Sequence, residues 1–337
     1  MKILTPIMSA SDIDILNPKL YNTEFFCGYL PQWWINEYND SKDKEGNLAT
    51  PINNRNGRNS NVTTIEELSL IVEKAKEYNT DIFLVLNAKY YPDYVYGSVS
   101  KYIEEVLGAG ITRMIVSDMG MIKFLSINFP TVKVSVSCLN QVTNKYSVEF
   151  YKSFANVDRI VFPRHMSSQE IASIATEVTG LEYEYFIFSN KCLYDDGYCR
   201  GIHEFTPICK DLFYSDFYTK NGNKIETVER RKLAYLEHEF ADWTRSELIC
   251  EGSDFCTPNF ACCACSLVKL SQISNITSVK LSIRGHNIQE RLRQVKMANE
   301  VISETSKGAT INDIKQIISR LYGKESLCED GTSCMMI

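Results

Sequence analysis

Long apolar runs are missing from this chain of 337 residues. No stretch approaches the roughly 20 apolar residues that a membrane-spanning helix requires, so we expect no membrane span. Residues 1–10 also lack the apolar core and the cleavage site of a secretory signal, and Asp12 and Asp14 follow them directly. The sequence therefore predicts a cytoplasmic protein.

The chain also has no excess of basic residues. The chain contains 36 Lys and Arg residues against 42 Asp and Glu residues, which gives a formal net charge of -6. Proteins that coat nucleic acid normally have a basic face, so nucleic acid is a less favoured partner, although a local basic patch stays compatible with this charge. We expect a small-molecule or peptide substrate, with RNA as a less favoured substrate. The apolar fraction of 44% is sufficient for a full core and excludes a disordered chain.

Common hydrolase motifs are absent too. The chain has only four histidines. None of them stands in a Ser-His-Asp spacing or in a His-Glu-x-x-His zinc helix. A hydrolase is therefore a secondary hypothesis.

Cysteine, in contrast, is abundant. Eight of the twelve cysteines lie between Cys192 and Cys265. In a reducing compartment such a concentration indicates metal binding or catalysis rather than disulfides. Four thiolates hold an iron–sulfur cluster even at irregular spacing, close pairs are typical of zinc, and a catalytic thiol requires a nearby base. The residues alone leave these three alternatives open.

Strand-like apolar runs alternate with helical patterns along most of the chain. We expect strands at residues 2–7, 24–27, 81–87, 112–117, 132–137, 158–162, 181–188 and 278–283. Strands that alternate with helices form parallel βαβ units, and eight of them suit a closed TIM-like (β/α)8 barrel. The barrel is expected over residues 1–305, with a cysteine-rich insertion at 190–277 before the last strand. Residues 306–337 are expected to form a C-terminal helix and a flexible tail.

In a parallel barrel, the loops at the C-terminal ends of the strands carry the chemistry. Arg164 and Arg284 suit a carboxylate ligand because guanidinium binds carboxylate bidentately. His165 suits proton transfer because imidazole titrates near neutrality. The polar residues expected at these strand ends are Asn87, Ser117, Asp118, Ser137, Cys138, Asn140, Arg164, His165, Ser189, Asn190 and Arg284.

The segment Arg159–Ile171 is similar to the block Arg-Val-Val-Leu-x-Arg-Glu-Leu-Ser-Leu-Glu-Glu-Ile of peptidase family U32, and this is the most specific match. Other segments resemble the same family. Ile111–Asp118 and Val134–Asn140 are similar to two family strands with polar ends. Asp81–Asn87 resembles an earlier family strand, and Ser278–Gly285 stands at the family's last strand.

The resemblance implies a TIM-like barrel and a cofactor. Family members that act in ubiquinone biosynthesis or hydroxylate RNA hold a 4Fe–4S cluster through four cysteines and carry out oxygen-independent hydroxylation, with prephenate implicated as the oxygen donor. Carried over residue by residue, the cluster ligands are Cys192, Cys199, Cys209 and Cys265. The hypothesis is therefore an iron–sulfur oxidoreductase, with zinc as the alternative metal. Its catalytic residues are Asp118, Arg164, His165 and Arg284, and its substrate-binding residues are Asn87, Asn140, Arg164 and Arg284.

The chain departs from the family pattern at three candidate site positions. Phe188 replaces a family histidine, His165 stands where the family has glutamate, and Arg284 stands in a segment that has lost the acidic residue of the final Glu-Gly-Arg. A peptidase or a non-catalytic iron–sulfur subunit is thus the alternative function. Some relatives act as pairs of unlike subunits, so a partner subunit or a homodimer is expected, and the electron donor is left open. The cysteines without a family counterpart are Cys250, Cys256, Cys262 and Cys263.

Overall fold

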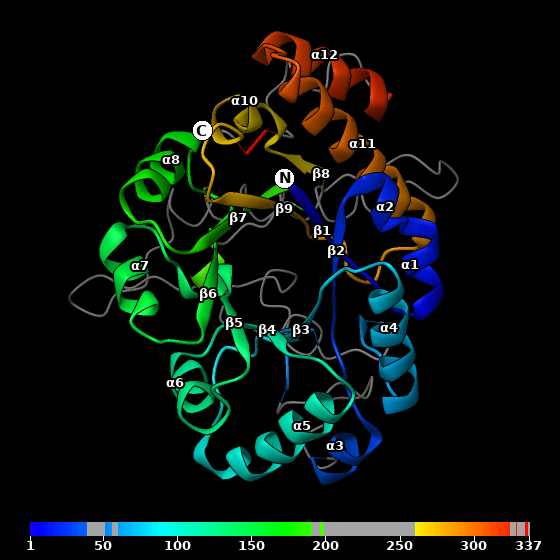
Figure 1. The fold of residues 1–337 in the computed structure, drawn as a ribbon, viewed down its shortest axis with the longest axis vertical. Coiled ribbons are helices and arrows are strands. Elements are labelled where there is room, and N and C mark those ends of the chain that lie inside the picture. Colours follow the sequence, from blue (N-terminus) through cyan, green and yellow to red (C-terminus); the bar gives the residue numbers. More distant parts are fainter. Residues whose placement is uncertain are drawn as a thin grey trace, which may run out of the picture.

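In the computed structural model of the protein, eight parallel strands of the described part of the chain close into a barrel (Figure 1). The structure describes residues 1–38, 51–55, 60–190, 196–198, 260–323, 328 and 334–335. Each strand pairs in parallel with the next, and pairing of β9 with both β7 and β1 closes the ring. The predicted TIM-like barrel is confirmed. Its strands are β1 (Lys2–Pro6), β2 (Thr23–Cys27), β3 (Ile82–Leu86), β4 (Arg113–Val116), β5 (Lys133–Val136), β6 (Val157–Val161), β7 (Glu182–Asn190) and β9 (Ile276–Leu281).

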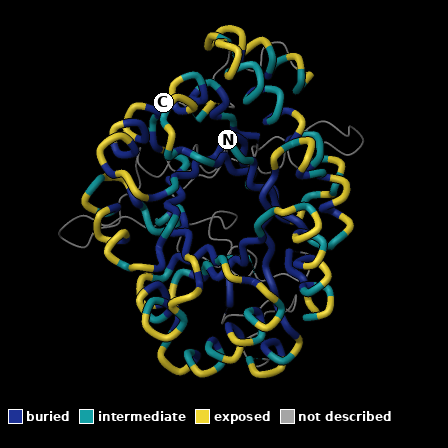
Figure 2. The backbone as a smooth tube through the Cα atoms, viewed as in Figure 1, coloured by how far each residue is buried: buried dark blue, intermediate teal, exposed yellow. Residues whose placement is uncertain are grey.

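The helices surround this ring, with their buried faces against the strands and their exposed faces outward (Figures 1 and 2). In the described segments, no helix has the length and apolar character needed to cross a membrane. The helices are α1 (Ala10–Leu16), α2 (Pro18–Tyr21), α3 (Gln32–Glu37), α4 (Ile65–Glu77), α5 (Tyr96–Gly108), α6 (Met119–Asn128), α7 (Lys145–Lys152), α8 (Ser168–Glu177), α10 (Leu267–Leu270), α11 (Ile288–Ser306) and α12 (Ile311–Tyr322).

Helix α8 begins at a capping box formed by Ser167 and Glu170. The Ser167 hydroxyl accepts a hydrogen bond from the Glu170 backbone N–H, with an N···O distance of 3.3 Å. The Glu170 carboxylate accepts one from the Ser167 backbone N–H, with an N···O distance of 2.8 Å. Two backbone donors of the first turn are thereby satisfied, which fixes where the chain turns after β6.

The barrel interior is apolar in its middle layer. Leu4, Phe26, Phe83, Val85 and Ile115 form one buried cluster there. A second, larger core lies between the strands and the helices. Because side chains alternate along a strand, each strand contributes to both cores in turn.

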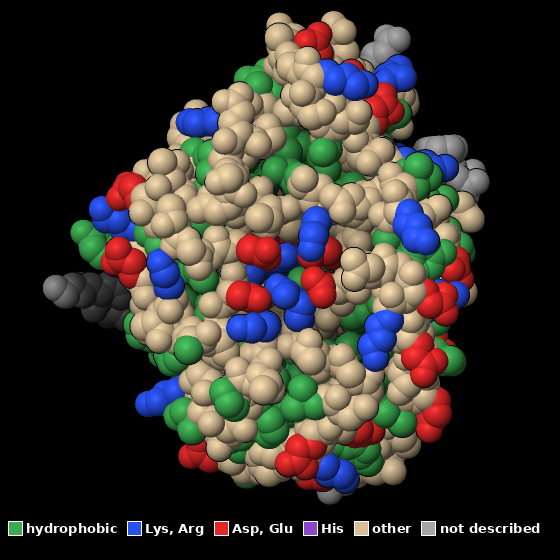
Figure 3. Space-filling model, in the orientation of Figure 1, with side chains coloured by type: hydrophobic (Ala, Val, Ile, Leu, Met, Phe, Trp, Pro, Cys, Tyr) green, Lys and Arg blue, Asp and Glu red, His purple; other side chains and the backbone are tan. Residues whose placement is uncertain are grey.

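Below the apolar layer, toward the N-terminal ends of the strands, the interior is charged. The guanidinium of Arg159 is almost fully buried and lies 2.8 Å from Glu24, 3.0 Å from Glu184 and 2.5 Å from Glu182. Burial raises the pKa of Glu24, but the charge of Arg159 outweighs it, so the pKa of this carboxyl is lowered. Figure 3 shows acidic and basic side chains gathered over the middle of the barrel on one face. Ion pairs thus link β2, β6 and β7 across the barrel.

One further strand, β8 (Phe260–Cys262), lies outside the ring. It pairs antiparallel with the end of β7, where Phe188 stands opposite Cys262. The sequence did not predict this strand, because a run of three residues has no readable alternation. It brings the end of the cysteine-rich insertion to the C-terminal end of β7.

Candidate functional site

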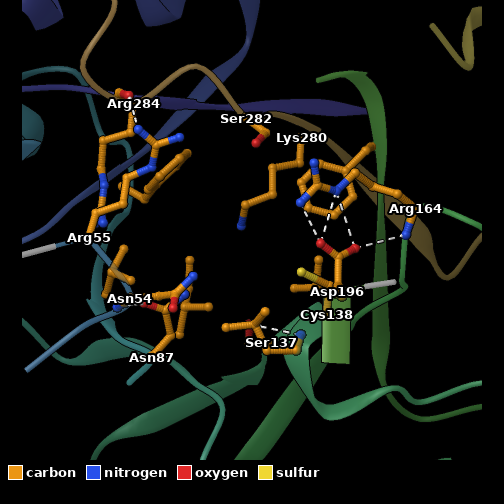
Figure 4. Close-up of a pocket in the computed structure, with 16 residues that line it drawn as sticks. Asn54, Arg55, Asn87, Ser137, Cys138, Arg164, Asp196, Lys280, Ser282 and Arg284 are labelled. Atoms are coloured by element: carbon orange, nitrogen blue, oxygen red, sulfur yellow. Dashed lines mark hydrogen bonds and ion pairs between the residues drawn. The ribbon is translucent and has the colours of Figure 1, made fainter. Parts of the chain in front are cut away.

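A cavity of about 170 Å³ opens at the C-terminal ends of the barrel strands (Figure 4). Its apolar floor consists of Phe26, Val85, Ile115, Val161 and Phe186, all from strands. Above the floor the lining is polar and rich in cations: Asn54, Arg55, Asn87, Ser137, Cys138, Arg164, Asp196, Lys280, Ser282 and Arg284. Among the described lining residues there are four cationic side chains and one carboxylate. The arrangement favours a small anionic ligand.

β9 and the residues directly after it bring two cations to the cavity. Lys280 faces the cavity from the strand, which ends at Leu281. Ser282 and Arg284 line the cavity from the loop and turn that follow the strand. Figure 4 shows Arg284 and Arg55 on one side of the space and Arg164 on the other, with Lys280 between them.

Arg164 is held by an ion pair with Asp196. Its Nε lies 3.0 Å from Asp196 Oδ1, its backbone N–H donates to Oδ2 at 3.2 Å, and its Nη2 also bonds the carboxylate. Asp196 is only 3% exposed. Burial raises the pKa of Asp196, but the Arg164 charge outweighs it and the pKa is lowered. The pair stays ionised at neutral pH and fixes Arg164 over the Phe186 ring, 5.3 Å from its centroid.

Arg284 is positioned by the segment that follows β2. Its Nη2 donates to Asn53 Oδ1 at 2.8 Å, and Asn53 Nδ2 donates to Asn61 Oδ1 at 2.9 Å. Arg55 Nη1 donates to the Arg284 carbonyl at 3.0 Å. The described part of this segment, residues 51–55, falls between the predicted strands at 24–27 and 81–87, and the sequence predicts no barrel element for it. In the structure it forms one wall of the cavity.

Lys280 joins the cavity to the charged interior below it. Its Nζ lies 3.0 Å from Glu184 Oε1 and 4.8 Å from the centroid of the Phe26 ring. Since Glu184 also pairs with Arg159, one connected set of ion pairs runs from the cavity to the N-terminal end of the barrel. Lys280 is one of three polar residues in the strand sequence Ile-Thr-Ser-Val-Lys-Leu, and nothing local distinguishes it as a side chain of the cavity.

Cys138 is the thiol that lines the described cavity. Burial, together with the neighbouring Asp196, raises the pKa of Cys138 to about 12. The thiol is therefore protonated at neutral pH and is a poor nucleophile. No histidine is among the described lining residues, so the described wall offers no imidazole base for it.

The predicted site residues separate into two groups in the structure. Asn87, Arg164 and Arg284 come together around the cavity. Asp118, Asn140 and His165 are not among the described lining residues.

Asp118 and Asn140 both make hydrogen bonds outside this lining. Asp118 accepts a hydrogen bond from the Met121 N–H at 2.6 Å and so caps α6, while burial raises its pKa. Asn140 accepts from the Tyr151 hydroxyl at 3.1 Å and donates to the Val116 carbonyl at 3.2 Å. His165 is exposed. A polar residue at a strand end thus caps or braces a loop as readily as it faces the cavity.

Three of the four predicted cluster ligands, Cys192, Cys199 and Cys209, lie outside the described residues. Cys265 is described: it is partly buried in a short 3-10 turn, Ala264–Ser266, and its Sγ lies 4.0 Å from the Ile311 carbonyl. Within the described residues, no three Cys, His, Asp or Glu side chains are already arranged around one metal position. Tyr185 lies near this turn, and its buried hydroxyl has no hydrogen-bond partner among the described residues.

Comparison with known proteins gives one consistent family. The profile of peptidase family U32 matches residues 49–325. The tRNA hydroxylation protein P1 of Bacillus subtilis (strain 168) is 30% identical over 141 residues, 42% of this chain and 33% of that protein. The tRNA hydroxylation protein P of Haemophilus influenzae is 29% identical over 99 residues, 29% of this chain and 21% of that protein.

The protein of the same name from Escherichia coli (strain K12) is 27% identical over 97 residues, 29% of this chain and 21% of that protein. These alignments therefore span a third or less of the relatives' own length. A solved structure of a U32 peptidase covers 85% of this chain and 93% of that chain, with 11% identity and a TM-score of 0.41.

Proposed function

This chain belongs to peptidase family U32, and from that membership and the cation-lined cavity we propose that it is an oxygen-independent hydroxylase. The cavity is the observation that carries the proposal. It would bind a small carboxylate-bearing hydroxyl donor, such as prephenate, at the mouth of the barrel. The substrate that accepts the hydroxyl group would approach the same mouth from outside.

Arg164 and Arg284 are the residues that we propose for donor binding. They lie on opposite sides of the cavity, and hydrogen bonds between a guanidinium and a carboxylate are strengthened by their opposite charges. Lys280, between them, offers a further cation close to the apolar floor. A cavity of about 170 Å³ suits a small metabolite and is too small for a folded macromolecule.

We propose tRNA as the acceptor. The relatives whose names state a function are tRNA hydroxylation proteins. The net charge of -6 does not favour a broad RNA-coating surface. Contact limited to a short unpaired segment of the tRNA at the barrel mouth is compatible with that charge, because unpaired bases are recognised by stacking and local hydrogen bonds.

The cofactor of this proposal is a 4Fe–4S cluster held by Cys192, Cys199, Cys209 and Cys265. One of the four ligands, Cys265, is described: it is a partly buried thiol at a turn near β7, and the buried Tyr185 hydroxyl nearby lacks a partner among the described residues. A bound cluster would supply one-electron transfer to the reaction. Zinc is the alternative metal for these thiols, and iron and sulfide analysis of the protein separates the two.

The peptidase alternative has less support at this cavity. A thiol protease needs a thiolate and a nearby imidazole. Cys138 is instead held in the protonated form, and the described lining lacks a histidine. Hydroxylation with a bound donor requires neither group.

Donor binding can be tested by titrating the anaerobically purified protein with prephenate and measuring the heat of binding. Arg284→Met should weaken binding about 10-fold to 100-fold, because a hydrogen bond to a charged group contributes about 1.5–3 kcal/mol. Arg320→Met on α12 is the matched control. Arg320 is not among the described residues that line the cavity, is 65% exposed and pairs with Glu300. Equal affinities for the wild type and Arg284→Met would exclude this role.

Hydroxylation can be tested in an Escherichia coli strain that lacks its own tRNA hydroxylation protein. Expression of the wild-type chain should restore a tRNA nucleoside heavier by one oxygen atom, detected by mass spectrometry after digestion. Arg284→Met should restore much less of it, and Arg320→Met should restore the wild-type level. Iron-loaded wild-type protein that leaves the tRNA unmodified would contradict tRNA as the acceptor.

A further inference from the structure

Lys280 is the one primary amine among the described residues that line the cavity. Its side chain extends from β9, and Figure 4 shows its ammonium group in the space between Arg164 and Arg284. Lys280 is only 8% exposed, so water has little access to it, but a small ligand in the cavity reaches it directly. A lysine amine can form a covalent bond with a carbonyl carbon, in addition to its role as a cation.

The surroundings of Lys280 are those of a lysine that acts as a nucleophile. Such a lysine lies in an apolar pocket or beside other cationic groups. Lys280 Nζ lies 4.8 Å from the centroid of the Phe26 ring in the apolar floor, and three guanidinium groups of the described lining share the cavity with it. Glu184 lies 3.0 Å from Nζ, and it also pairs with Arg159 at 3.0 Å. Glu184 therefore orients the amine while dividing its charge between two cations.

The cavity around this amine selects the class of carbonyl compound. Guanidinium groups stand on both sides of Lys280, and they favour a ligand that carries a carboxylate. The volume of about 170 Å³ admits only a small molecule. In a 2-oxo acid the carboxylate is bonded directly to the carbonyl carbon, so both groups fit into a space in which amine and guanidinium are neighbours.

We propose that Lys280 forms an imine with a small 2-oxo acid in this cavity. Glu184 accepts a proton from the ammonium, the amine attacks the carbonyl carbon, and the proton returns to the carbonyl oxygen, which leaves as water. A C=N bond forms and the C=O bond breaks. Ammonium and ketone thus give a protonated imine and one water molecule, so atoms and charge balance. Because the protonated imine is again a cation, it keeps the contacts with Glu184 and the Phe26 ring.

The inference deepens the donor site of the proposed function. Prephenate carries a 2-oxo carboxylate, so for this ligand the imine rests on the proposed function. Imine formation with another 2-oxo acid, such as pyruvate, requires neither the cluster nor tRNA, and pyruvate is therefore the probe.

The test is reductive trapping of protein purified without oxygen, with pyruvate and cyanoborohydride, which reduces an imine to a stable secondary amine. Peptide mass spectrometry of the wild type should locate an adduct at residue 280, at pyruvate concentrations that leave surface lysines and the N-terminal amine unmodified. Lys280→Arg keeps a cation beside Glu184 but lacks a primary amine, so it should form no adduct there. Lys2→Met is the matched control. Lys2 also pairs with a buried glutamate, Glu24 at 2.6 Å, but is not among the described lining residues, so trapping should proceed at the wild-type rate.

The carboxylate requirement gives a second readout. Acetone has the ketone but no carboxylate, and it should be trapped about 10-fold more slowly than pyruvate; Arg284→Met should slow the trapping of pyruvate by a similar factor. A folded wild type without an adduct at residue 280 would overturn the proposal, and so would acetone trapped as fast as pyruvate. If pyruvate is trapped while tRNA stays unmodified, the imine stands and the hydroxylase proposal falls. Modified tRNA without trapping gives the reverse.

Discussion

Gly28, directly after β2, lies where the polar wall of the cavity leaves no room for a side chain. A methyl group there would stand 2.0 Å from Asn61 Oδ1 and 3.0 Å from Arg284 Nη1. Both residues belong to the hydrogen-bonded chain that sets Arg284 in place, in which Asn61 Oδ1 accepts from Asn53 and Arg284 Nη2 donates to Asn53. The glycine therefore matters to the site because it leaves room for Asn61 and Arg284.

Gly28→Ala should displace Asn61 and move Arg284 out of position. We expect a loss of stability of about 1–3 kcal/mol, which is typical of overpacking, and a several-fold loss of prephenate affinity. The measurements are urea unfolding and calorimetric titration. Gly97→Ala on α5 is the control: no atom lies within 4 Å of its added methyl group, so it should stabilise the protein by about 0.5–1 kcal/mol. Unchanged stability and unchanged prephenate affinity in Gly28→Ala would show that Asn61 and Arg284 can shift without cost.

The sequence was sufficient to find part of this site. Arg164 and Arg284 follow strands, and the strand-end rule identified them. Asp196 and Arg55 were not identified, because nothing in their local sequence shows which distant residue they contact. Lys280 lies inside a strand, and the strand-end rule considers only residues after a strand. Side chains that reach the cavity through long-range packing thus require the structure.

The N-terminal cap of α8 follows directly after the loop that carries Arg164. Ser167→Ala removes the hydroxyl that accepts the Glu170 N–H, and an N-cap residue replaced by alanine typically costs about 1 kcal/mol. We expect a loss of that size in urea unfolding. Ser173→Ala, on an exposed position of the same helix, should be neutral or slightly stabilising, because alanine has the higher helix propensity. Equal effects of the two substitutions would contradict a capping role.

The barrel strands were predictable because each carries a buried apolar run between helical patterns. Strand β8 was not, and neither was the role of residues 51–55 in the cavity wall. Both depend on pairing with parts of the chain that lie far away in sequence, such as Phe188 for β8 and Arg284 for Arg55. Local periodicity determines an element, and only tertiary contacts determine where an isolated short segment lies.

Charged side chains, rather than apolar ones, occupy the interior of the N-terminal half of the barrel. Arg159 of β6 contacts Glu24 of β2 across the interior and Glu184 of β7 beside it. A layer of branched apolar residues would be usual there. Since Lys280 shares Glu184 with this layer, the electrostatics of the cavity depend on the ion pairs below it.

Arg159→Met should therefore destabilise the whole barrel. The substitution leaves Glu24 and Glu184 buried with one lysine each, Lys2 at 2.6 Å and Lys280 at 3.0 Å. Removing one partner of a buried ion pair typically costs about 3–5 kcal/mol, and we expect the lower end of that range because these lysines remain. Arg113→Met is the control. Arg113 is 20% exposed and pairs with Asp158 at 2.9 Å, so its removal should cost roughly 1 kcal/mol.

The pH dependence of this cost gives a second readout. In the wild type the pKa of Glu24 is lowered, so its contribution to stability is present above its ordinary value of 4.5 and is lost as the pH falls through the lower folded value. Without Arg159, burial raises the pKa of Glu24 relative to the wild type, and protonation relieves the buried charge. The difference in unfolding free energy between wild type and Arg159→Met should consequently shrink as the pH falls from about 7 to about 4. A difference that stays constant over this range would show that Arg159 stabilises the barrel by packing against Phe83 rather than by charge.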